Sequence, residues 1–124
     1  MKYALLLYAD EADWEGLDPE AQGEVMAQHG AATEAMQSAG AYVGGEALDL
    51  TNTAKTLRLR DGKPVVTDGP FIEAKEALGG FYLVECASMD EALDFAARIP
   101  EARTGAVEVR PILDFDALEA EAAG

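Results

Sequence analysis

Apolar residues at the start of the chain alternate on both sides of a strand predicted over residues 2–9. The two sets of side chains are Tyr3, Leu5 and Leu7 on one side and Ala4, Leu6 and Tyr8 on the other. A strand that is apolar on both sides needs other parts of the protein to cover both faces of its sheet, so this segment predicts a central strand.

Two later segments have the spacing of amphipathic helices. An Asp N-cap followed by Pro predicts a helix over residues 18–39 that Gly40 ends. Its inward stripe consists of Val25, His29, Ala32 and Met36. A capping box at residues 88–91 opens a second amphipathic helix, which Pro100 ends.

Alternating or short apolar runs predict the remaining strands. We expect them at about residues 41–48, 53–60, 64–67, 80–86 and 106–112. Asp61-Gly62 is a hairpin turn signal between the second and third of these, and Pro64 favours an edge position. Gly44-Gly45 predicts a bulge or a close approach of two backbones.

This order of elements is strand, helix, strand, inserted hairpin, strand, helix, strand. It predicts an α+β fold of the ferredoxin-like type, with both helices on one face of an antiparallel sheet. We expect one domain over residues 1–124, with a short acidic tail at about 114–124 in which Phe115 and Leu118 dock. Two helices cover one face only, so the second apolar face predicts a homodimer.

Charge narrows the possible partners. The chain has 24 acidic and nine basic residues, a net charge of −15, which disfavours nucleic acid and anionic membranes as partners. The first apolar run is too short for a signal peptide, and no stretch is long enough to span a membrane. The single cysteine, Cys86, fits a reducing cytoplasm and is expected to be a small packing residue.

His29 and the segment Asp68-Gly69-Pro70-Phe71 are the main candidates for chemistry. His29 is the only side chain that titrates near neutral pH without help, although a histidine packed beneath the sheet explains its position equally well. Asp68 precedes Gly-Pro and either caps a turn or orients an imidazole, and one residue can do both. One His and one Cys make an ordinary zinc site impossible, and no dinucleotide fingerprint is present. His29 with Asp68, Glu46 or Glu73 could hold a harder divalent metal, but no ligand spacing indicates such a site, so we expect no metal and no cofactor.

The segment 68–71, together with Gln28-His29 and the Gly-Gly-Glu-Ala-Leu stretch at 44–48, resembles the DGPF branch of the YCII-related superfamily. The resemblance implies a dimeric α+β barrel and a helix-borne histidine that works with an aspartate as an acid–base pair. On this basis His29 and Asp68 are the expected catalytic residues. The expected substrate-binding residues are Glu46, Phe71, Glu73 and Lys75.

These observations predict a small cytoplasmic enzyme that carries out cofactor-free acid–base chemistry on a small organic molecule, of a lyase, isomerase or hydrolase type. In this view Asp68 orients His29, and Lys75 or an arginine holds an anionic substrate. The alternative is a non-catalytic dimer that binds a ligand or regulates, which fits the association of DGPF proteins with sigma-factor systems. A purely structural dimer without a pocket is the third possibility.

Overall fold

The computed structural model describes residues 1–123, which form a four-stranded sheet, a separate hairpin and five helices. The strands are β1 (Lys2–Ala9), β2 (Tyr42–Ala47), β3 (Lys55–Arg60), β4 (Lys63–Asp68), β5 (Ala77–Glu85) and β6 (Ala106–Pro111). The helices are α1 (Glu11–Glu15), α2 (Pro19–Ser38), α3 (Met89–Ala96), α4 (Glu101–Thr104) and α5 (Phe115–Ala123), with a 3₁₀ turn at Thr51–Thr53.

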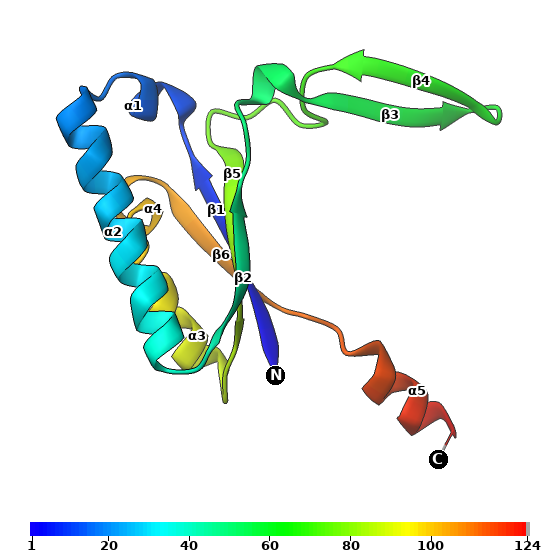
Figure 1. Ribbon diagram of the computed structural model, residues 1–124. Coiled ribbons are helices and arrows are strands. Elements are labelled where there is room, and N and C mark those ends of the chain that lie inside the picture. The colour runs from blue at the N-terminus through cyan, green and yellow to red at the C-terminus, as the bar shows by residue number, and fades with distance from the viewer. Residues whose placement is uncertain (124) are drawn as a thin grey trace.

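The main sheet has the strand order β2-β5-β1-β6, and all its neighbours are antiparallel. This confirms the predicted α+β class with β1 as a central strand. Helices α2 and α3 lie on the same face of the sheet (Figure 1). The core lies between these layers, and its largest fully buried side chains are Leu5, Met36, Ile99 and Val84.

Both main helices begin where the sequence predicts. The Asp18 carboxylate accepts the backbone N–H of Ala21 at 2.8 Å, and Pro19 follows at the first helical position. The Ser88 hydroxyl oxygen accepts the N–H of Glu91 at 3.2 Å. Gly40 ends α2 with a φ of 69°, a conformation that side chains with a Cβ resist.

The glycine pair in β2 has both predicted properties. A register shift between Tyr42 and Gly44 marks a bulge opposite β5. Gly45 lies so close to β5 that a Cβ there would be 2.8 Å from the Phe81 carbonyl oxygen and 3.0 Å from Cδ1 of Tyr82. The missing side chain at position 45 therefore leaves the space that the Tyr82 ring occupies.

Strands β3 and β4 form the inserted hairpin, which projects from the main sheet (Figure 1). Asp61 and Gly62 form its turn, with φ values of 52° and 76°, as the Asp-Gly signal predicts. Between Lys55 and Asp68 every residue except Thr56 is exposed. The hairpin thus has almost no packing against the rest of its own chain.

The face of the sheet opposite α2 and α3 is bare within residues 1–123. Leu6, Phe81 and Leu83 point to this face and are half-buried by their neighbours in the sheet. The tail prediction is wrong for this chain on its own: residues 115–123 form helix α5, and Phe115 is 70% and Leu118 45% exposed. Phe115 and Leu118 could dock only against an apolar surface. Helix α5 extends away from the body of the chain, so these side chains do not reach one (Figure 1).

Besides α5, the sequence pattern did not predict three short elements: α1, the 3₁₀ turn and α4. Helix α4 matters most, because Pro100 ends the α3 region and at the same time serves as the N-cap position of α4. None of the helices within residues 1–123 is both long and apolar enough to cross a membrane.

Candidate functional site

A cavity of about 650 Å³ lies between α2 and the sheet, at the end of the sheet where α1 packs. Side chains of α2 form one wall, among them Val25 and His29. Strands β2 and β5 form the other wall, with Tyr42 and Tyr82. The volume suits a small organic ligand.

His29 sits in this cavity with both ring nitrogens engaged. Nδ1 lies 2.8 Å from the Tyr82 hydroxyl oxygen, and Nε2 lies 2.9 Å from Oε1 of Glu101. The histidine and tyrosine rings are also stacked, with centroids 6.0 Å apart. Three elements that are distant in sequence, α2, β5 and α4, therefore meet at one imidazole.

The partners fix the tautomer of the neutral imidazole. A carboxylate can only accept, so Nε2 carries the proton toward Glu101. Nδ1 is then the acceptor, and the Tyr82 hydroxyl donates to it. The arrangement is a continuous hydrogen-bond chain from Tyr82 through His29 to Glu101.

Glu101 is held at the start of α4, and a second contact ties this helix to α2. The Arg103 guanidinium donates to the side-chain carbonyl of Gln28 at 2.6 Å. Adjacent residues of α2, Gln28 and His29, thus bind two residues of α4. The other oxygen of Glu101, Oε2, is buried and has no hydrogen-bond partner within residues 1–123. A buried acceptor without a donor is costly, so the packing of α4 against α2 carries an unfavourable contribution at this oxygen.

Burial raises the pKa of the Tyr82 hydroxyl, the side chain of Thr33 partly offsets this, and the negative charge of Glu101 raises the pKa further. The phenol therefore stays protonated at neutral pH and is a hydrogen-bond donor there. Thr33 itself donates its hydroxyl to the His29 carbonyl at 2.9 Å, which packs it beside the pair.

Carboxylates line the cavity together with apolar side chains. They are Asp10, Glu11, Glu46, Asp49 and Glu101. Glu11 also binds the Thr51 backbone N–H at 2.8 Å and the Thr51 hydroxyl, which joins α1 to the 3₁₀ turn at the cavity rim. Among the described residues that line the cavity there is no Lys and no Arg. The electrostatic field in the cavity therefore favours neutral or cationic ligands.

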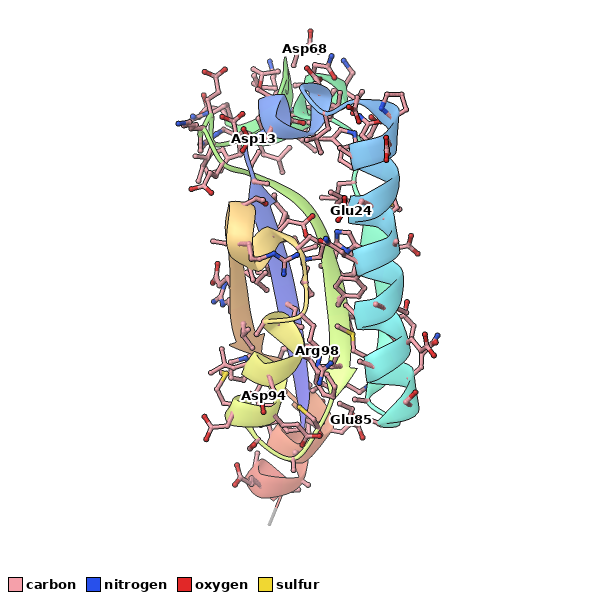
Figure 2. All side chains as sticks on the ribbon, turned by 90° about the vertical axis from the view of Figure 1, so that its left-hand side faces the viewer. Asp13, Glu24, Asp68, Glu85, Asp94 and Arg98 are labelled. Carbon is pink, nitrogen blue, oxygen red and sulfur yellow. The ribbon has the colours of Figure 1, made fainter. Side chains whose placement is uncertain are left out.

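Asp68 lies away from this cavity. It ends β4, is 86% exposed and forms an ion pair with Lys55 at 2.6 Å. Figure 2 shows it at the top of the molecule, at the hairpin end. Gly69 beside it has a φ of 96°, as the turn interpretation of this segment predicts. The carboxylate that meets His29 within the chain is that of Glu101, in the place that the sequence analysis assigned to Asp68.

The predicted substrate-binding residues fall into two groups. Glu46 lines the large cavity. Phe71 lies under the Arg58 guanidinium, 4.5 Å from its carbon to the ring centroid, and Glu73 lines a second hollow of about 320 Å³ at the hairpin base. Lys75 is exposed in the same segment. The structure thus separates these last three residues from His29.

No three His, Cys, Asp or Glu side chains of residues 1–123 come together in a way that could hold a metal ion. Cys86 lies at the end of the main sheet, and its thiol donates to the Ser88 carbonyl at 3.5 Å. Burial raises the pKa of this thiol, which suits packing better than nucleophilic attack.

The amino-acid sequence matches a known protein family over nearly its whole length. The model of the YCII-related domain matches residues 1–116. The chain belongs to the YCII-related family. This YCII-related chain is also 44% identical over 114 residues to the uncharacterized protein R00369 of Rhizobium meliloti (strain 1021), a match that covers 90% of this chain and 92% of the relative. Both matches span the segments that supply His29, Tyr82 and Glu101.

Two of the three residues at the centre of the site were missed from the sequence. Tyr82 lies in the strand predicted at residues 80–86, and the strand pattern does not single it out, although its hydroxyl needs a partner wherever it is buried. Glu101 directly follows the Pro100 helix stop. A Pro-Glu pair after a helix is typical of a new helix start, and this signal pointed to α4.

Proposed function

We propose that this YCII-related protein is a cofactor-free acid–base enzyme that transfers protons to and from a small organic substrate. The observation that carries the proposal is the chain Tyr82–His29–Glu101 in a ligand-sized cavity. An imidazole between a hydroxyl and a carboxylate is a general arrangement for moving a proton at neutral pH.

The proton moves in two linked steps. The Tyr82 oxygen accepts a proton from the substrate while its own proton passes to Nδ1 of His29. The resulting imidazolium keeps its Nε2–H directed at Glu101, whose negative charge stabilises it. The reverse sequence returns the proton to a different atom of the substrate, which gives an isomerisation or an elimination. Glu101 takes the orienting role that the sequence analysis gave to Asp68.

The cavity walls define the class of substrate. Five carboxylates line it, and no Lys or Arg of the described residues does. We propose a substrate with an apolar body and an amine or hydroxyl donor that faces these carboxylates. Glu46 remains a proposed substrate contact. The anionic substrate held by Lys75 is less well supported, because Lys75 lies outside this lining.

Deuterium incorporation tests the proposal whatever the product of the reaction is. The protein is incubated in D₂O with a panel of small amines, alcohols and carbonyl compounds, and deuterium at carbon is measured by mass spectrometry. For a compound that exchanges, His29→Ala lowers the rate about 100-fold or more. Glu24→Gln is the matched control, because Glu24 is exposed on α2 and outside the cavity lining. An undiminished rate in His29→Ala contradicts the proposal.

The alternative function is that of a non-catalytic dimer that binds a ligand or regulates, for example in a sigma-factor system. The hydrogen bonds at both ring nitrogens of His29 favour this alternative. A histidine that is fully hydrogen-bonded can serve to shape a cavity. In this case compounds bind in the cavity without any deuterium exchange, and His29→Ala changes affinity alone.

We further propose a cytoplasmic homodimer with the ferredoxin-like arrangement of the DGPF branch. The support is the bare sheet face with Leu6, Phe81 and Leu83, which a second copy would cover. The sheet order β2-β5-β1-β6 with α2 and α3 on one face fits the ferredoxin-like description. Light scattering after gel filtration measures the mass in solution.

A further inference from the structure

The hairpin β3–β4 has two chemically different faces. Residues alternate along its strands, so the cross-strand pairs Leu57–Val66 and Leu59–Pro64 lie on one face. Arg58 and the pair Arg60–Lys63 lie on the other. Leu57 is 61% and Leu59 68% exposed. One face of this projecting arm is therefore apolar and uncovered beyond the Lys55–Asp68 ion pair at its base, and the other is mainly basic.

A two-stranded hairpin that packs against nothing is marginally stable in water. Its ladder continues at the base, where Gly69 donates its N–H to the Ala54 carbonyl at 2.8 Å and the Thr56 hydroxyl donates to the Gly69 carbonyl at 2.9 Å. These contacts lengthen the hairpin but do not cover its apolar face. Such a surface is typical of a contact with another chain.

The charge of the arm is opposite to that of the body. Residues 55–68 contain four basic and two acidic side chains, a net charge of +2, and the rest of the chain has five basic against 22 acidic ones, a net charge of −17. Residues 113–123 contain four acidic and no basic residues, together with exposed Leu113, Phe115 and Leu118. This C-terminal segment thus has a net charge opposite in sign to that of the hairpin, and exposed apolar side chains that suit the apolar face of the hairpin, on which Lys55 also lies.

The two segments cannot meet within one chain. The hairpin and α5 both extend on the side of the sheet opposite α2, but from opposite ends of it (Figure 1). In a two-fold dimer each contact occurs twice, so two hairpins and two C-terminal segments can satisfy one another.

We propose that the hairpin of each copy packs its apolar face against residues 113–123 of a second copy. The proposal rests on the homodimer suggested above and adds which segments hold it together. It is independent of the acid–base chemistry, since His29 takes no part in it.

Zero-length carbodiimide cross-linking tests this contact, because it joins a Lys amine to a carboxylate that touches it. An equal mixture of ¹⁴N and ¹⁵N chains is cross-linked and digested. We expect Lys55, the lysine on the apolar face, joined to Asp114, Asp116, Glu119 or Glu121 in peptides of which about half carry both isotopes. The intrachain product of Lys55 with Asp68 is the internal control and gives only unmixed peptides.

Two double variants, one on each side of the proposed contact, separate the contact from hairpin folding. Leu57→Ser with Leu59→Ser, and independently Phe115→Ser with Leu118→Ser, each weaken the dimer at least about tenfold by light scattering over a dilution series. A dimer that is unchanged in either variant, or a Lys55 link only to other regions of the second copy, overturns the inference while leaving the dimer intact. A monomeric wild-type protein overturns the dimer as well, whereas the deuterium experiment on His29 is unaffected by either result.

Discussion

Oε1 of Glu101 lies 2.9 Å from Nε2 of His29, although 72 positions separate the two residues in the chain. The contact joins the middle of α2 to the first residue of α4, and Tyr82 approaches the opposite nitrogen of the same ring. One imidazole therefore reports on the packing of three elements, and its protonation pattern can be measured directly.

The first prediction concerns the tautomer of His29. Because Glu101 can only accept, the neutral ring carries its proton on Nε2, and two-bond ¹H–¹⁵N correlation spectra at alkaline pH show this single form. Glu101→Leu removes the acceptor and gives a mixture of the two tautomers. Glu24→Gln leaves the spectrum unchanged. A wild-type ring protonated mainly on Nδ1 would contradict the hydrogen-bond chain.

The second prediction follows from the raised pKa of Tyr82. The folded state holds this phenolic proton more tightly than the unfolded chain, so Tyr82 stabilises the fold below its unfolded pKa of about 10 and loses that contribution as pH rises through the folded pKa. The free energy of unfolding therefore falls above about pH 10, and it falls less steeply in Tyr82→Phe. Denaturant titrations between pH 8 and 11 measure both slopes, and equal slopes would exclude the proposed burial of the hydroxyl.

The sequence predicted the main elements well because their signals are local. The Asp18 cap, the Ser88 capping box and the Asp61-Gly62 turn depend on neighbouring residues, and each forms as expected. Alternation along β1 is local in the same way, since Tyr3, Leu5 and Leu7 are buried together on one side of the strand. Which of the two apolar sides the helices cover is not a local property, and the sequence pattern did not predict it.

The partner of His29 could not be obtained in this way. Periodicity places His29 on the inward stripe of α2, but which carboxylate reaches it depends on where α4 begins after Pro100. Asp68 stands out in the sequence because it precedes Gly-Pro, but it ends a strand of the hairpin and pairs with Lys55 there. No local sequence pattern specifies how this hairpin is oriented relative to the main sheet. Long-range contacts of this kind depend on how the elements pack together.

The third prediction concerns the close approach at Gly45. A Cβ at this position would lie 2.8 Å from the Phe81 carbonyl oxygen, a backbone atom that cannot turn aside. Gly45→Ala should therefore cost about 1–3 kcal/mol in the free energy of unfolding and displace the Tyr82 ring. Gly44→Ala is the matched control, because a Cβ there meets nothing within 4 Å. Denaturant titration of both variants measures the difference, and equal losses would contradict the close packing.

The last prediction concerns ligand charge. Phenethylamine and 3-phenylpropionate have similar apolar bodies and opposite charges, so they compare the electrostatics of the cavity directly. With carboxylates around it and no Lys or Arg among the described lining residues, the cavity should bind the amine at least about tenfold more tightly by calorimetry. Added salt reduces the difference in affinity between the amine and the carboxylate. Glu101→Gln also reduces this difference, since the substitution removes a partly buried negative charge from the cavity lining. Glu24→Gln leaves the difference unchanged. A preference for the carboxylate would instead indicate that basic groups from a second copy reach the cavity, and it would contradict the proposed substrate class.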